Sequence, residues 1–163
     1  MGRLEQLMDA MVEYDAGDPK RIQHFVKVHA FARQIGVGEG ADPDLLHTLE
    51  AAAIVHDIGI HLAEQKHKST AGKYQELEGP APAREMLAKL GFDAATVDRV
   101  CYLVGHHHTY TCIDGLDYQA LVEADFLVNL YEDGTSRAGI EAAYKNIFRT
   151  ETGRRLCRTM FGL

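Results

Sequence analysis

Apolar residues recur three and four positions apart from one end of the chain to the other, and no stretch keeps the strict alternation of a β-strand. This spacing is typical of amphipathic helices. Residues 60–78 begin as a short helix and become a polar loop around Ser69 to Gly72. The other predicted helices cover residues 4–17, 19–36, 43–59, 80–90, 93–106, 117–134, 136–148 and 150–161. The pattern therefore predicts an all-α fold of about eight helices.

Two Asp-Pro pairs mark the starts of predicted helices. Asp18 and Asp42 each precede a proline, and an aspartate at the N-cap followed by proline in the first turn is a strong start signal. Glycines follow the last apolar residues of these two segments, as expected where helices end. No repeat, low-complexity tract or linker interrupts the chain. We expect one domain over residues 1–163.

The composition is that of a folded globular protein, with 46% hydrophobic and 25% charged residues. The formal net charge is −7, which disfavours a long nucleic-acid groove. A small phosphorylated molecule bound in a local positive pocket stays compatible with this charge.

The three cysteines form no C-x-x-C pair, so the sequence indicates neither a disulfide framework nor a thiolate zinc site. No apolar run approaches the roughly 18 residues of a membrane span. The first residues carry acids where a secretion signal would be apolar. We expect a cytoplasmic protein with no membrane partner, and the sequence leaves a homodimer open.

Four polar side chains fall on otherwise apolar faces. His24 shares a helical stripe with apolar residues, His56 and Asp57 end the run "AAAIV", and Asp125 lies on a stripe with Leu121. A single inward histidine is usually a hydrogen-bonded core residue, and a single inward aspartate is usually a cap or half of an ion pair. Here no lysine or arginine shares the stripes. A divalent cation explains all four together, because it keeps the acids ionised and uses the imidazole lone pairs.

The order His24, His56-Asp57, Asp125 resembles the H…HD…D signature of the HD-domain superfamily of metal-dependent phosphohydrolases. The segments "HFVKVHAFA", "AAAIVHDIG" and "LVEADFLVN" are similar to its motifs, and the resemblance covers residues from about 20 to 130. It implies an all-helical fold in which the four residues bind one metal. Two nitrogens and two oxygens suit Mn, Fe, Co or Ni better than Mg or Zn.

Some branches of this family hold a second metal bridged by the aspartate of the HD pair. The segment "LVGHHHTY" resembles the one that carries the additional histidines, with His107 or His106 as the ligand. Where those branches often have a further histidine, this chain has Gln75, for which Glu76 or Glu78 would have to substitute. A lysine that often follows "HDIG" is replaced by Ile60, and a GYP motif is missing. These departures argue against a cyclic dinucleotide phosphodiesterase.

The resemblance also implies a chemistry, the attack of metal-bound water on phosphorus, with Asp57 orienting or deprotonating the water. Further cations are expected to hold the phosphoryl oxygens. The loop "QKHKSTAGKYQ" follows the metal motif and supplies Lys68 and Lys73 as candidates, of which Lys73 is preferred for a catalytic role.

The predicted activity is hydrolysis of a phosphate ester or anhydride in a nucleotide or other small phosphorylated metabolite. Two alternatives remain. A di-iron oxygenase would need a complete second metal site, against which Gln75 argues. A catalytically silent sensor would bind a metal or nucleotide and signal to a partner, although the intact set of ligands disfavours it.

Overall fold

The computed structural model describes all 163 residues and contains ten α-helices and no β-strand. The helices are α1 (Arg3–Tyr14), α2 (Pro19–Gly38), α3 (Pro43–Val55), α4 (Ile60–His67), α5 (Gly72–Glu78), α6 (Pro80–Lys89), α7 (Ala94–Val104), α8 (Leu116–Glu132), α9 (Arg137–Asn146) and α10 (Glu151–Phe161). The all-α prediction is confirmed. None of the helices combines the length and the hydropathy that crossing a lipid bilayer requires.

Aspartate side chains cap three of these helices at their N-termini. Asp18, Asp42 and Asp93 each accept a hydrogen bond from the backbone N–H three residues later, at 3.2, 2.9 and 2.9 Å respectively. Each bond satisfies one of the amide donors that a helix leaves free at its start. The caps at Asp18 and Asp42 fix where α2 and α3 begin, and these helices carry or lead into three of the four predicted metal ligands.

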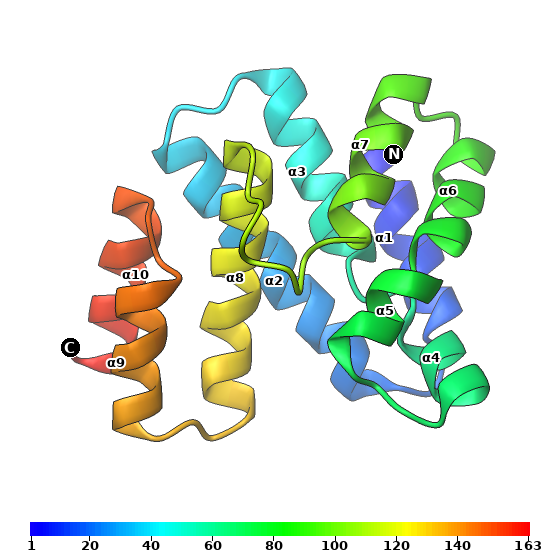
Figure 1. Cartoon of the computed structure of the whole chain (residues 1–163). Helices are drawn as coiled ribbons and strands as arrows, with labels where there is room; N and C mark the ends of the chain where they lie inside the picture. Colours follow the sequence, from blue (N-terminus) through cyan, green and yellow to red (C-terminus); the bar gives the residue numbers. More distant parts are fainter.

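The core is one cluster of 32 buried apolar residues, to which every helix except α4 and α5 contributes. Helix α2 packs most extensively against α8 and α3. In Figure 1, α9 and α10 lie on the outer side of α8, and α4 to α7 form the opposite side of the molecule. The loop that follows α7 crosses between these two sides before α8 begins.

Helix α5 occupies part of the segment predicted as a polar loop. Its position depends on Gly59, because a Cβ there would lie 2.6 Å from the carbonyl oxygen of Gln75 and 2.7 Å from the nitrogen of Gly79. The side chain of Gln75 is buried and donates to the carbonyl of Thr70 at 2.6 Å. The short helix is therefore held by tertiary contacts, which the hydrophobic pattern of its own residues does not reveal.

A buried carboxyl group, that of Glu123, joins α8 to the start of α10. Its Oε2 accepts the backbone N–H groups of Arg149 and Thr150, both at 3.0 Å, and its Oε1 accepts the Thr150 hydroxyl at 2.6 Å. A Cβ at position 153 would lie 1.8 Å from Oε1, so this position requires Gly153. The contact fixes the C-terminal helices against the helix that carries Asp125.

We expect Glu123→Ala to lower the free energy of unfolding by roughly 2–4 kcal/mol, because it leaves several buried donors without an acceptor. Urea denaturation followed by circular dichroism measures the change. The exposed control Glu141→Ala should change it by less than about 0.5 kcal/mol. Equal effects of the two substitutions would show that the Glu123 contact does not stabilise the fold.

Candidate metal centre

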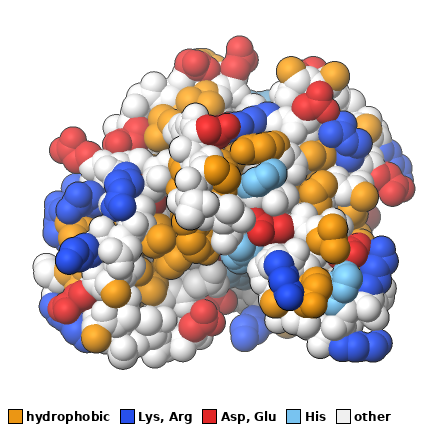
Figure 2. Space-filling model, in the orientation of Figure 1, with side chains coloured by type: hydrophobic (Ala, Val, Ile, Leu, Met, Phe, Trp, Pro, Cys, Tyr) orange, Lys and Arg blue, Asp and Glu red, His pale blue; other side chains and the backbone are white.

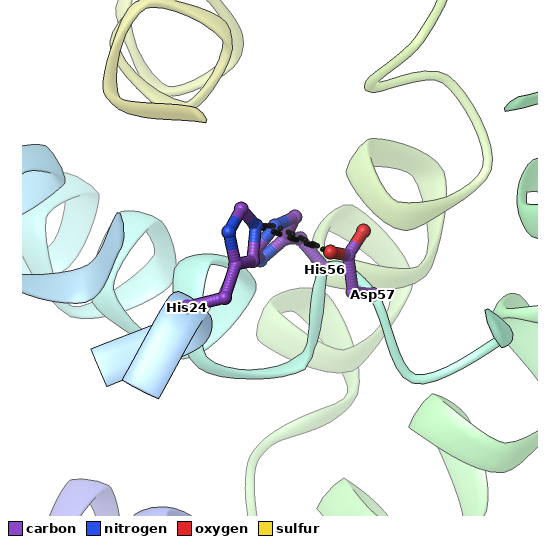
Figure 3. A group of neighbouring side chains, drawn as sticks. All are labelled: His24, His56 and Asp57. Atoms are coloured by element: carbon purple, nitrogen blue, oxygen red, sulfur yellow. Dashed lines mark hydrogen bonds and ion pairs between the residues drawn. The ribbon is translucent and has the colours of Figure 1, made fainter. Parts of the chain in front are cut away.

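The four predicted ligands come from three separated segments and meet at one point. His24 lies in α2, His56 and Asp57 directly follow α3, and Asp125 lies in α8. The Nε2 atom of His24 is 3.2 Å from Nε2 of His56, 3.2 Å from Oδ2 of Asp57 and 3.1 Å from Oδ1 of Asp125. Figure 3 shows the two imidazole rings directed toward the Asp57 carboxylate.

His56 completes the group with the same spacing. Its Nε2 lies 3.3 Å from Oδ2 of Asp57 and 3.4 Å from Oδ1 of Asp125, and the ring is fully buried. Adjacent ligands of an octahedral ion with bonds of about 2.1 Å are separated by about 3 Å. The separations between these atoms are close to that value. The arrangement can therefore hold a divalent metal ion.

Hydrogen bonds at the other ring nitrogens orient both histidines. Nδ1 of His56 lies 2.7 Å from the carbonyl oxygen of Ala53, and Nδ1 of His24 lies 2.9 Å from Oε1 of Glu132. These acceptors assign a proton to each Nδ1, so each neutral ring presents the lone pair of its Nε2 to the other and to two carboxylate oxygens. Four facing lone pairs repel one another unless a positive charge lies between them. The chemistry of these donors fits a metal ion.

Protons are the alternative source of that positive charge. Burial lowers the pKa of His24, but hydrogen bonds and charge from Asp125 and Asp57 outweigh it and raise the pKa to about 11. The pKa of His56 is likewise raised to about 10, by both carboxylates and against the effect of burial. Burial opposes ionisation of Asp57 and Asp125, yet the histidines hold the pKa of both carboxyl groups well below the usual range. A metal ion would replace protons in this cluster.

Two further side chains of α8 support the ligands and were missed by the sequence analysis. Asn129 donates from Nδ2 to Oδ1 of Asp125 at 3.0 Å. Glu132 accepts from His24 and lies 3.3 Å from the ammonium group of Lys27. They follow Asp125 by four and seven positions, which is the spacing of one helix face. That spacing was the signal that could have identified them.

A second group of three potential ligands shares Asp57. It consists of Asp57, His107 and His108. Nε2 of the buried His107 lies 3.3 Å from Oδ1 of Asp57, while its Nδ1 bonds to the carbonyl of Val104 at 2.9 Å. Burial, together with the charge of His107, lowers the pKa of His108 to about 4, so this ring is neutral near pH 7. The two oxygens of Asp57 thus face two different groups of donors.

Gln75 stands beside His108, at the position where the family resemblance suggested a histidine. Its Oε1 lies 2.9 Å from Nε2 of His108. The glutamine amide donates to Thr70, so Oε1 is the acceptor and His108 donates from Nε2. The glutamine therefore holds the histidine ring through this nitrogen.

The structure does not bring His106 or Glu78 to either group. His106 stacks on Tyr102 and bonds through Nδ1 to the carbonyl of that residue at 2.7 Å. Glu78 is held by Lys66 and His67, each at 2.9 Å. His106 is therefore turned toward its own helix and Glu78 toward α4, and of the histidine run it is His107 and His108 that lie beside Asp57.

The predicted substrate lysines also lie elsewhere. The ammonium group of Lys68 bonds to the carbonyl of Gln65 at 3.2 Å, and that of Lys73 lies over the Tyr74 ring, 4.8 Å from its centre. Neither lysine lines the cavity beside the metal ligands. Each ammonium group therefore contacts a residue close to it in the sequence, and neither is directed at the candidate metal ligands.

That cavity has a volume of about 380 Å³, and its floor contains three of the four ligands. Its lining residues are Asp18, Lys20, Arg21, His24, Asp57, Ile60, Thr70, Gln75, His108, Asp125, Asn129, Glu132 and Asp133. In Figure 2, histidine side chains are visible in the hollow between the two sides of the molecule. The cations of the lining come from the first turn of α2, where Arg21 pairs with Asp18 at 2.8 Å and with Glu64 at 2.7 Å.

The comparisons with known proteins agree with this geometry. The family model of the HD domain matches residues 21–132, and the chain belongs to this family. Its structure is similar to the crystal structure of a predicted HD superfamily hydrolase from an uncultured Thermotogales bacterium. The TM-score is 0.70 at 24% sequence identity, over 97% of this chain and 84% of the other, which shows a shared fold. No curated protein sequence matches the chain.

We expect metal binding at pH 7 to release at least one proton. The raised pKa values of about 11 for His24 and about 10 for His56 mean that the metal-free cluster is protonated at this pH, so the ion must displace a proton. Calorimetric titration with Mn²⁺ in buffers of different ionisation enthalpy measures the release. Affinity should rise between pH 6 and pH 8. Heats that do not depend on the buffer would contradict the assignment.

We expect Glu132→Gln to weaken metal binding about tenfold, because a charged acceptor on Nδ1 makes Nε2 of His24 a better donor to the ion. The glutamine keeps the size and an acceptor oxygen, so the fold should be preserved. Calorimetry with Mn²⁺ gives the dissociation constant. Glu141→Gln, on the exposed face of α9, is the matched control and should leave it unchanged. Equal affinities of the two variants would exclude a role for the Glu132 charge.

Proposed function

We propose that the protein is a metal-dependent hydrolase that acts on a small phosphorylated compound. The observation that carries the proposal is the set of four facing donor atoms, two of them imidazole lone pairs, beside a polar cavity that His24, Asp57 and Asp125 line. Membership of the HD domain family and the similarity to a protein described as a predicted hydrolase support it.

His24, His56, Asp57 and Asp125 would hold the ion. A divalent ion in this position supplies Lewis acidity, which lowers the pKa of water and attracts the charge of a phosphoryl oxygen. Asp57 is 17% exposed in its side chain and lies at the cavity floor, so it can accept a proton from, and orient, a water molecule there. The hydrogen bonds at Nδ1 of both histidines keep their Nε2 atoms directed at the ion.

The phosphoryl oxygens would be bound by cations of α2 in place of the predicted Lys68 and Lys73. Lys20 lines the cavity, is exposed, and has no carboxylate within ion-pair distance. The charge of Arg21 is already shared by Asp18 and Glu64. Lys20 is therefore the cation that is free to pair with an incoming anion, as transition-state charge stabilisation requires.

The second group of donors around Asp57 favours one alternative, a di-iron oxygenase. Asp57 faces both groups, and a bridging carboxylate is what two adjacent ions would need. Only His107 and His108 complete the second group, because Gln75 presents an amide there. Metal analysis of the purified protein and a comparison of activity with and without oxygen distinguish the two reactions.

We expect the wild-type protein loaded with Mn²⁺, Co²⁺, Ni²⁺ or Fe²⁺ to release phosphate from p-nitrophenyl phosphate without oxygen. His56→Ala and Asp57→Ala should abolish both metal binding and hydrolysis, since each removes a ligand. Lys20→Met should raise KM several-fold while metal content stays the same. The opposite outcome would be substrate consumption that requires oxygen and two irons per chain and releases no phosphate. It would show that the protein is an oxygenase and would overturn the proposal.

A further inference from the structure

The lining of the cavity contains no phenylalanine, tyrosine or tryptophan. The two tyrosines that follow the histidine run lie elsewhere: Tyr118 is buried with its hydroxyl on the carbonyl of His106 at 2.7 Å, and Tyr110 packs against Phe126. Tyr110 lines a separate depression with residues such as Ile147. Proteins that recognise nucleobases commonly stack them on aromatic side chains. The rings in this lining are those of His24 and His108, which belong to the two groups of potential metal ligands, so no other aromatic ring is left for stacking.

Hydrogen-bonding groups without a protein partner surround the ligands instead. The carboxylate of Asp133 and the hydroxyl of Thr70 are exposed to solvent and have no protein hydrogen-bond partner, and the amide oxygen of the half-buried Asn129 has none either. All three residues line the cavity, and Ile60 is its one apolar residue. Acceptors arranged around a polar cavity suit a ligand that brings several hydroxyl donors.

The charges of the lining favour a ligand with a single phosphoryl group over a polyphosphate. Its carboxylates are Asp18, Asp57, Asp125, Glu132 and Asp133, whereas its cations are Lys20 and Arg21. A divalent ion would offset two of these acids, and Asp18 and Glu132 are already paired with Arg21 and Lys27. No excess positive charge is left for a di- or triphosphate chain, which an enzyme must neutralise to bind.

We propose that the substrate is the phosphate monoester of a polyhydroxylated compound, a sugar phosphate or a polyol phosphate. Its phosphoryl group lies toward the metal ligands and Lys20, and its hydroxyl groups donate to Asp133, Asn129 and Thr70. This inference rests on the proposed phosphohydrolase function. It narrows the sequence-based prediction, a nucleotide or other small phosphorylated metabolite, to a substrate that carries no base.

The test compares metal-loaded wild-type protein on four probes: a hexose monophosphate, a pentitol monophosphate, a nucleoside monophosphate and p-nitrophenyl phosphate. We expect kcat/KM for the better polyhydroxylated ester to exceed that for the nucleotide at least tenfold. A nucleotide used equally well or better overturns the inference while the proposed function stands. If no probe is hydrolysed, the proposed function fails, and calorimetric binding of the same esters then decides: tighter binding of the nucleotide overturns the inference, and tighter binding of the sugar or polyol ester supports it.

Substitution of the lining residue Asp133 gives an independent test. The ratio to measure is kcat/KM for the polyhydroxylated ester divided by kcat/KM for p-nitrophenyl phosphate. Asp133→Ala should reduce this ratio about tenfold, because only the polyhydroxylated ester has hydroxyl groups that can donate to Asp133. Asp98→Ala, at an exposed aspartate of α7, is the matched control and should keep the wild-type ratio. An unchanged ratio in Asp133→Ala overturns the assignment of Asp133 as an acceptor for the substrate hydroxyl groups. Selective loss of nucleotide hydrolysis in Tyr110→Ala would reveal base stacking and overturn the inference as well.

Discussion

The repulsion between two imidazole nitrogens 3.2 Å apart, which share their space with two carboxylate oxygens, is the constraint on which this site depends. The packed helices α2 and α8 and the end of α3 hold these atoms together, and the groups on Nδ1 prevent the rings from turning away. Only a positive charge makes this arrangement stable. In the metal-free protein, protons supply this positive charge. A divalent ion bound between the four side chains would supply it instead.

The all-α fold and the convergence of four ligands followed from the sequence because both depend on helix periodicity. Helical spacing places His24 and Asp125 on inward faces, and the apolar run before His56 places the HD pair at the core. Residues on one face of a buried helix have little freedom in direction. The family resemblance added that these separate faces meet around one ion, which periodicity alone does not establish.

The proposed substrate contacts could not be predicted in the same way. Lys73 and Glu78 belong to a short polar helix, where stacking and ion pairs with nearby residues decide the direction of each side chain. Lys20 gave no signal in the sequence, since it is one of several exposed lysines and gains its place only through the packing of α2 beside α8. Glu132 was different, because its seven-residue spacing from Asp125 was visible in the sequence.

Helices α4 and α5 contribute nothing to the main apolar cluster, yet they lead into or carry Ile60, Thr70 and Gln75 on one wall of the cavity. The opposite wall belongs to α2 and α8, which carry the candidate ligands His24 and Asp125. Exposed positions of this wall, such as Thr70, can therefore accept substitutions without disturbing the candidate ligands or the main core, whereas Gln75 and Gly79 are fixed by their contacts with His108 and Val104. Substitutions in this wall of the cavity would change which substrate binds, while the four residues of the candidate metal centre stay the same.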